Sequence, residues 1–154
     1  MKKIRVGVAG YGTIGQRLAD GVAQQEDMEL VGIADLAPTL SLQALRERDM
    51  VGANGVKYDL YLVDGADKAS FAGKDIPVAG SFDELCQKVD IMLDSAPGGV
   101  GAKNKENYYD KYGVKAIFQG GEKNSVADVF FHGYANYEKG VGQNYLKLTS
   151  CNTT

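Results

Sequence analysis

The glycine-rich segment at residues 10–15, with the sequence GYGTIG, constrains this chain more than any other feature. It follows an apolar run, Ile4–Ala9, which predicts a strand. It leads into Thr13–Ala23, where apolar residues recur at every fourth position and predict an amphipathic helix. A strand that enters a helix through three closely spaced glycines is typical of a turn where the backbone must approach another group closely.

Each glycine of this segment has its own role in a site for a dinucleotide. Gly10 would allow the sharp turn out of the strand, Gly12 would let a pyrophosphate approach the backbone, and Gly15 would let the helix pack closely on the sheet. The free N–H groups and the partial positive charge of the helix N-terminus would then face the phosphates. The alternative is that the glycines form a tight turn and nothing more.

An acidic residue completes the fingerprint of a dinucleotide site. Asp35 comes directly after a second predicted strand, Glu29–Ala34, and lies 20 residues after Gly15. A carboxylate at this place can accept hydrogen bonds from the hydroxyls of an adenosine ribose, and it would repel a 2′-phosphate. Asp35 therefore favours NAD over NADP as the cofactor. The alternative is that Asp35 only caps the segment that follows.

The rest of the chain alternates between short apolar runs and helical segments. Helices are expected after Thr39 or Ser41, after Ser81, whose spacing from Glu84 is that of a capping box, and over Asn104–Tyr112 with Gly113 as its C-terminal cap. Further strands are predicted at Tyr58–Val63, Ile76–Ala79, Ile91–Ser95, Val114–Phe118, Val126–Phe131 and Tyr145–Ser150. This alternation predicts an α/β fold, a Rossmann-type, mostly parallel sheet with helices on both faces.

Length and composition exclude several classes of protein. A chain of 154 residues suits one domain, and we expect residues 1–150 to form a dinucleotide-binding domain and residues 151–154 to begin a missing catalytic domain. A net charge of −3 argues against a nucleic-acid partner, and no apolar run reaches the ~18 residues of a membrane span. Two distant cysteines form neither a disulfide framework nor a metal pair, so the sequence predicts a reduced, cytoplasmic protein without a metal site.

Three single residues are candidates for chemistry. Cys151 comes directly after the last predicted strand, and the N–H groups of a helix beginning there would lower its thiol pKa and hold an oxyanion. A small buried residue at a strand end explains Cys151 from spacing equally well. Cys86 lies in the helix after Ser81 and is expected in the core. His132, the only histidine, is expected to be a partly exposed residue at a strand end rather than a base.

Four motifs together resemble one family. They are GYGTIG at 10–15, SAPGGVGAKN at 95–104, KAIFQGGEK at 115–123 and SCNTT at 150–154. In this order they resemble the type II, archaeal-type, phosphorylating glyceraldehyde-3-phosphate dehydrogenases over essentially the whole chain. The resemblance implies a cytoplasmic, homotetrameric NAD(P)-dependent oxidoreductase of glycolysis. Such an enzyme acts on glyceraldehyde 3-phosphate and inorganic phosphate through a cysteine thioester.

The resemblance also implies roles for individual residues. Cys151 matches the catalytic nucleophile, Ser150 and Asn152 match its substrate-binding neighbours, and Thr13, Ile14, Gly120 and Gly121 match cofactor contacts, with residues 95–98 along the same crevice. The chain departs from the pattern in two ways. Many members lack an acid where Asp35 stands, and the family's catalytic histidine lies in a later domain, so His132 does not match it. A semialdehyde or acyl-phosphate reductase and a non-catalytic NAD-binding module remain alternatives.

Overall fold

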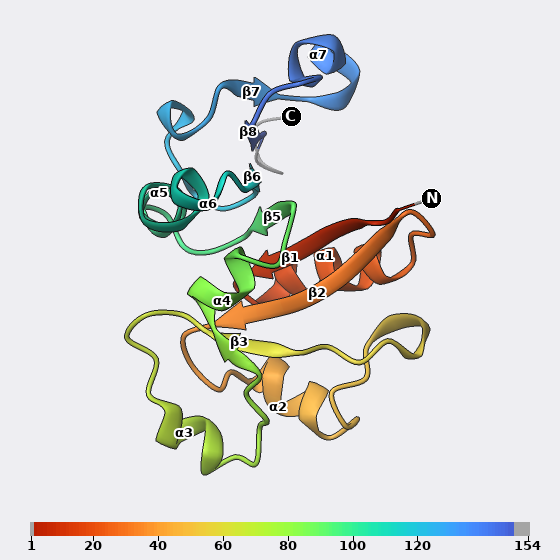
Figure 1. Cartoon of the computed structure of the whole chain (residues 1–154), viewed down its shortest axis with the longest axis vertical. Helices are drawn as coiled ribbons and strands as arrows, with labels where there is room; N and C mark the ends of the chain where they lie inside the picture. The colour runs from red at the N-terminus through yellow and green to blue at the C-terminus, as the bar shows by residue number, and fades with distance from the viewer. Residues whose placement is uncertain (1, 150–154) are drawn as a thin grey trace.

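The computed structural model describes residues 2–149, which form a single eight-stranded sheet in the order β4-β3-β2-β1-β5-β6-β8-β7 (Figure 1). Every pairing in the sheet is parallel. The strands are β1 (Ile4–Ala9), β2 (Met28–Asp35), β3 (Leu60–Leu62), β4 (Gly80–Ser81), β5 (Ile91–Asp94), β6 (Lys115–Phe118), β7 (Val129–Phe131) and β8 (Tyr145–Leu148). The predicted α/β, Rossmann-type fold is therefore confirmed.

Helical segments connect the strands. They are α1 (Thr13–Ala23), α2 (Leu40–Arg46), α3 (Lys68–Ala72), α4 (Phe82–Cys86), α5 (Val100–Asn104), α6 (Asp110–Tyr112) and α7 (Gly133–Gly140), with the short 3-10 turns η1 (Ala53–Gly55) and η3 (Asn124–Val126). The segment η2 (Lys105–Tyr109) is a π-helix that joins α5 to α6. α5, η2 and α6 thus form one continuous helical stretch in which one turn is wider than the rest.

Neighbouring residues of the central strands point to opposite faces of the sheet. Val8 and Ile33 belong to one buried cluster, which also contains residues of α1 and α2. Ala9 and Ala34 belong to a second cluster, which contains residues of α4 and η2. Side chains alternate across a strand, so the two clusters lie on the two faces of the sheet and each face is covered by its own helices.

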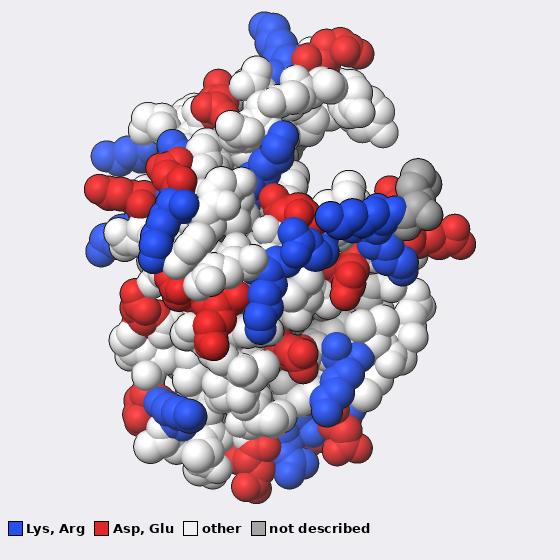
Figure 2. Space-filling view, in the orientation of Figure 1, with Lys and Arg blue, Asp and Glu red and all other residues white. Residues whose placement is uncertain are grey.

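The surface carries both signs of charge. Acidic and basic side chains are interspersed over the face shown in Figure 2. Between residues 2 and 149, no helix is both long and apolar enough to cross a membrane.

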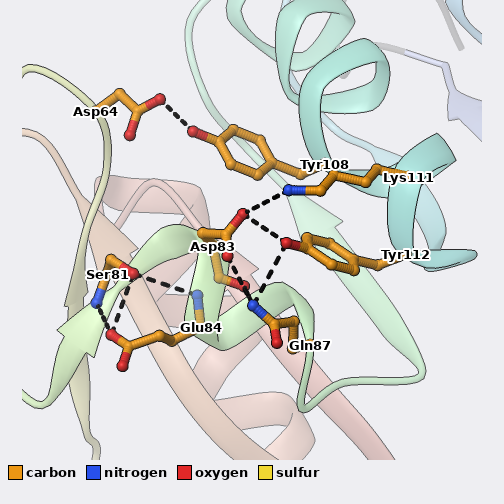
Figure 3. A network of polar contacts seen from close by, with 8 residues as sticks. All are labelled: Asp64, Ser81, Asp83, Glu84, Gln87, Tyr108, Lys111 and Tyr112. Atoms are coloured by element: carbon orange, nitrogen blue, oxygen red, sulfur yellow. Dashed lines mark hydrogen bonds and ion pairs between the residues drawn. The ribbon is translucent and has the colours of Figure 1, made fainter.

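Local sequence signals located several elements correctly. β1 and α1 have the predicted bounds, and Thr39 caps α2 by accepting a hydrogen bond from the Leu42 N–H at 3.4 Å. The predicted capping box at the start of α4 is present (Figure 3). The Ser81 N–H donates to Glu84 Oε2 at 2.7 Å, and the Glu84 N–H donates to Ser81 Oγ at 3.3 Å. These signals act between residues that are close in sequence, and so they need no tertiary context.

Other predicted bounds were wrong. No strand covers Ile76–Ala79, and β4 consists of only the two residues that follow this segment. Ile76 is 3% exposed and packs in the cluster with α1 and α2, so its apolar character reflects a buried loop. The strands expected at Tyr58–Val63 and Val126–Phe131 are shorter, with β3 limited to Leu60–Leu62 and β7 to Val129–Phe131. The sequence pattern did not predict α3 or α7.

The strand order creates a crevice beside β1. From β1 the chain builds outward through β2, β3 and β4, and then returns to the other side of β1 as β5. The loops that follow β1 and β5 therefore leave the sheet in different directions at their carboxyl ends. In parallel α/β sheets, ligands bind at the place where the strand order reverses, which is called the switch point.

Candidate functional site

A cleft of about 470 Å³ opens at the carboxyl ends of the central strands. Its lining includes Gly10 after β1, Asp35 at the end of β2, Asp64 after β3 and Pro97 after β5. The fold therefore brings together Gly10 and Asp35, which the sequence had assigned to one site. A larger hollow of about 750 Å³ lies beside α5 and the loop after β6, and it contains none of these four residues.

Two glycines of the loop are required by the protein itself. Gly10 has φ of +84°, a conformation that favours glycine, and its N–H donates to the Ala34 carbonyl at 2.8 Å. A Cβ added to Gly15 would lie 1.8 Å from the Gly10 carbonyl oxygen and 3.1 Å from Ser95 Oγ. The close packing of α1 predicted from Gly15 is thus confirmed.

Gly12 is different, because nothing in the protein requires glycine there. Its φ is −81°, which any residue adopts, and a Cβ added to it would meet no atom within 4 Å. Gly12 precedes α1, whose first turn, with the exposed Thr13 and Ile14, has no side-chain cap. The free N–H groups of an 11-residue helix thus border open space. This arrangement fits a diphosphate, which needs both the donors and the room.

Asp35 joins the glycine loop to the end of β2. Its Oδ2 accepts a hydrogen bond from the Tyr11 N–H at 2.9 Å, and its Oδ1 accepts one from the Leu36 N–H at 2.7 Å. The alternative role of Asp35 as a cap is therefore present in the structure. It does not exclude a binding role, because each carboxylate oxygen can accept a second hydrogen bond, for instance from a ribose hydroxyl.

The loop after β5 rests on a buried polar network that was not predicted from the sequence. Asp94 is 1% exposed and accepts hydrogen bonds from the Ala96 N–H at 3.0 Å, Asn104 Nδ2 at 2.9 Å and the Tyr109 hydroxyl at 2.6 Å. Burial raises the pKa of Asp94. Next to it, Ser95 Oγ donates to the Gly10 carbonyl at 2.8 Å, which fixes the two loops of the switch point to each other. One feature of the sequence indicates this network: Asp94 is an acidic residue at the end of an otherwise apolar strand.

The second pair of glycines lies beyond the cleft. Gly120 follows β6, and a Cβ added to it would lie 2.2 Å from the Ala96 carbonyl oxygen, so the loops after β5 and β6 touch through their backbones. Gly121 lies against Gly98 and lines the larger hollow. The structure therefore places both glycines next to the loop that borders the cleft, on the side away from Asp35.

The remaining candidates fall into two groups. Ser150, Cys151 and Asn152 lie outside the described residues. Cys86 is 1% exposed and burial raises the pKa of its thiol to about 12, which confirms the prediction that it packs in the core. His132 is half-buried directly after β7, as expected for a residue at a strand end.

Comparison with known proteins identifies close relatives in sequence. No family model matches the chain. The glyceraldehyde-3-phosphate dehydrogenase of Archaeoglobus fulgidus is 44% identical over 154 residues, which is all of this chain and 43% of that protein. Those of Methanobacterium bryantii and Pyrococcus abyssi are 46% and 45% identical over 149 and 152 residues, 97% and 99% of this chain and 42% and 43% of those proteins. The chain thus spans less than half the length of these relatives and matches their N-terminal portion.

A solved structure supports the fold. Aspartate semialdehyde dehydrogenase II from Vibrio cholerae superposes with a TM-score of 0.63 at 17% identity, covering 98% of this chain and 43% of that one. At this identity the likeness concerns the fold alone.

Proposed function

We propose that this chain, which corresponds in sequence to the N-terminal portion of the archaeal glyceraldehyde-3-phosphate dehydrogenases, binds NAD and forms the cofactor part of a phosphorylating aldehyde dehydrogenase. Gly12 carries the proposal. Neither its backbone conformation nor its neighbours require glycine, and the space before it lies at the uncapped start of α1. A ligand that approaches the backbone explains why the position has no side chain.

Asp35 in the cleft and the residues of the loops around the cleft fit the same ligand. The N–H groups of the first turn of α1, at Thr13 and Ile14, would hold the diphosphate, with Gly15 keeping the helix close to the loop. Asp35 would accept hydrogen bonds from the hydroxyls of the adenosine ribose, and Gly120 and Gly121 would border the other end of the path. When bound, the nicotinamide supplies the acceptor for a hydride.

The full activity is proposed from the relatives. The relatives are glyceraldehyde-3-phosphate dehydrogenases, which supports glyceraldehyde 3-phosphate as the substrate, and the resemblance supports Cys151 as the nucleophile, flanked by Ser150 and Asn152. Cys151 would attack the aldehyde carbon, and the hydrogen on that carbon would leave as a hydride to the bound nicotinamide. The acyl group would remain on Cys151 as a thioester, which inorganic phosphate would cleave to an acyl phosphate and the free thiol.

The test of this proposal is a calorimetric titration of the chain with NAD and with NADP. We expect NADP to bind at least about tenfold more weakly, equivalent to roughly 1.4 kcal/mol, because its 2′-phosphate would meet the Asp35 carboxylate. In Asp35→Asn the preference should shrink or reverse, since the charge is lost while the shape is kept. The absence of NAD binding would refute the cofactor role, and equal binding of NADP would refute the role of Asp35.

Asp27→Asn is the matched control. It changes the net charge by the same amount, but Asp27 is exposed and precedes β2 at the end opposite to Asp35. We expect this variant to keep the preference of the parent. A shift equal to that of Asp35→Asn would mean that overall charge, and not the carboxylate in the cleft, sets the preference.

A further inference from the structure

The part of the cleft beyond Asp35 has exposed apolar walls. Leu36, in the loop after β2, is 53% exposed, and Val100, at the start of α5, is 39% exposed, yet both line the cleft. They come from elements on either side of β1, and Val63 and Phe82 line the cleft with them. Large aliphatic side chains left open to solvent on two sides of a cleft suit a flat, largely apolar group such as a heterocyclic base.

Polar groups border the same part of the cleft. Asp64 follows β3, the strand next to β2, and one of its oxygens accepts a hydrogen bond from the Tyr108 hydroxyl (Figure 3). Among residues 2–149, its other oxygen accepts no hydrogen bond. Asn107 lines the cleft as well. Asp64, which lines the cleft, therefore keeps one carboxylate oxygen that can accept a hydrogen bond and cannot donate one.

Tyr108 holds this carboxylate in place. Its side chain is 8% exposed, and its ring packs edge-on against Phe82 at 5.1 Å between centroids. Tyr108 and Tyr109 are neighbours in η2, and they bond to Asp64 after β3 and to Asp94 at the end of β5. Burial raises the pKa of Tyr108, so its hydroxyl stays a donor across the neutral range. π-helical turns often occur at functional sites.

We propose that Asp64, positioned by Tyr108, recognises the exocyclic amino group of the adenine base of the dinucleotide. The inference rests on the proposed function, because Asp35 identifies the side of the cleft that takes the adenosine ribose. Asp64 lines the same cleft as Asp35 and follows β3, the strand next to β2, so a base attached to that ribose would have Asp64 beside it. Adenine presents an N–H donor to it, whereas hypoxanthine carries a carbonyl oxygen at the same ring position, so that two acceptors would face each other.

Calorimetric titration with NAD and with nicotinamide hypoxanthine dinucleotide tests the inference. We expect the parent chain to bind NAD at least about tenfold more tightly. In Asp64→Asn the discrimination should fall to about threefold or less, because an amide can donate to the carbonyl of hypoxanthine. Tyr108→Phe should reduce the discrimination in the same direction. Tyr112→Phe is the control, since Tyr112 also bonds to a carboxylate, that of Asp83 at 2.7 Å, but does not line the cleft.

The outcomes separate this inference from the proposed function. A parent that binds neither dinucleotide overturns both. A parent that binds both equally well overturns the role of Asp64 and leaves NAD binding intact. If Asp64→Asn discriminates between the two dinucleotides as strongly as the parent does, the role of Asp64 is also overturned. Loss of discrimination in Tyr112→Phe as well as in Tyr108→Phe overturns the positioning role of Tyr108, because a general loss of packing would then explain both.

Discussion

Two alanine substitutions in the glycine loop should separate binding from stability. In Gly15→Ala the new methyl group would lie 1.8 Å from the Gly10 carbonyl oxygen, so α1 and the loop must move apart by more than 1 Å. Overpacking of this kind costs up to about 3 kcal/mol, and the gain in helix propensity returns roughly 1 kcal/mol. We expect the free energy of unfolding to fall by about 2 kcal/mol.

Gly12→Ala should behave in the opposite way. Nothing lies within 4 Å of the new methyl group and the φ of −81° suits alanine. Alanine is a poorer N-cap than glycine by about 0.5–1 kcal/mol, and a gain of similar size from a stiffer unfolded chain offsets this loss. Stability should therefore stay within about 0.5 kcal/mol of the parent. NAD should bind at least about tenfold more weakly, because the methyl group occupies the approach of the diphosphate.

Urea unfolding followed by circular dichroism, together with calorimetric titration of NAD, measures both effects. The nine tyrosines and the absence of tryptophan make tyrosine fluorescence a second probe of unfolding. If Gly12→Ala bound NAD within threefold of the parent, the open space before Gly12 would not be the diphosphate site. If Gly15→Ala were as stable as the parent, the close contact of α1 with the loop would not limit the fold.

Two further results are expected. The Arg5 guanidinium donates hydrogen bonds to Asp90 at 2.6 Å and 3.1 Å and lowers the pKa of Asp90 to about 2. The pair therefore stabilises the fold above about pH 4, and this stabilisation is lost as the pH falls toward 2. The stability advantage of the parent over Asp90→Asn, measured by urea unfolding, should shrink over that range, and a constant advantage would contradict the pairing. Iodoacetamide labelling at pH 7, followed by mass spectrometry, tests the two cysteines. Cys151 should react about tenfold faster than free cysteine if it is an activated nucleophile. Cys86 should stay unmodified until the chain is unfolded, because burial raises the pKa of its thiol to about 12. If Cys151 reacted only at the rate of free cysteine, a non-catalytic dinucleotide-binding module would be favoured.

Short-range chemistry made several features predictable from the sequence. The bounds of α1, the cap at Thr39 and the capping box of Ser81 and Glu84 depend on residues within a few positions of one another. The apolar run at Ile76–Ala79 predicted a strand where the structure has a buried loop, since burial in a loop and burial in a strand leave the same apolar pattern. Apolar character therefore identified buried segments more reliably than it identified their secondary structure.

The sequence by itself predicted that a strand would enter a helix through a glycine turn and that Gly10 and Asp35 would belong to one site, and the structure places both residues in one cleft. Only the tertiary structure decided what completes the cleft. Tyr108 meets Asp64 across 44 positions of sequence, and Asn104 and Tyr109 meet Asp94 through a π-helical turn. These contacts depend on the order of the strands in the sheet and on the width of one helical turn, and local residue patterns encode neither.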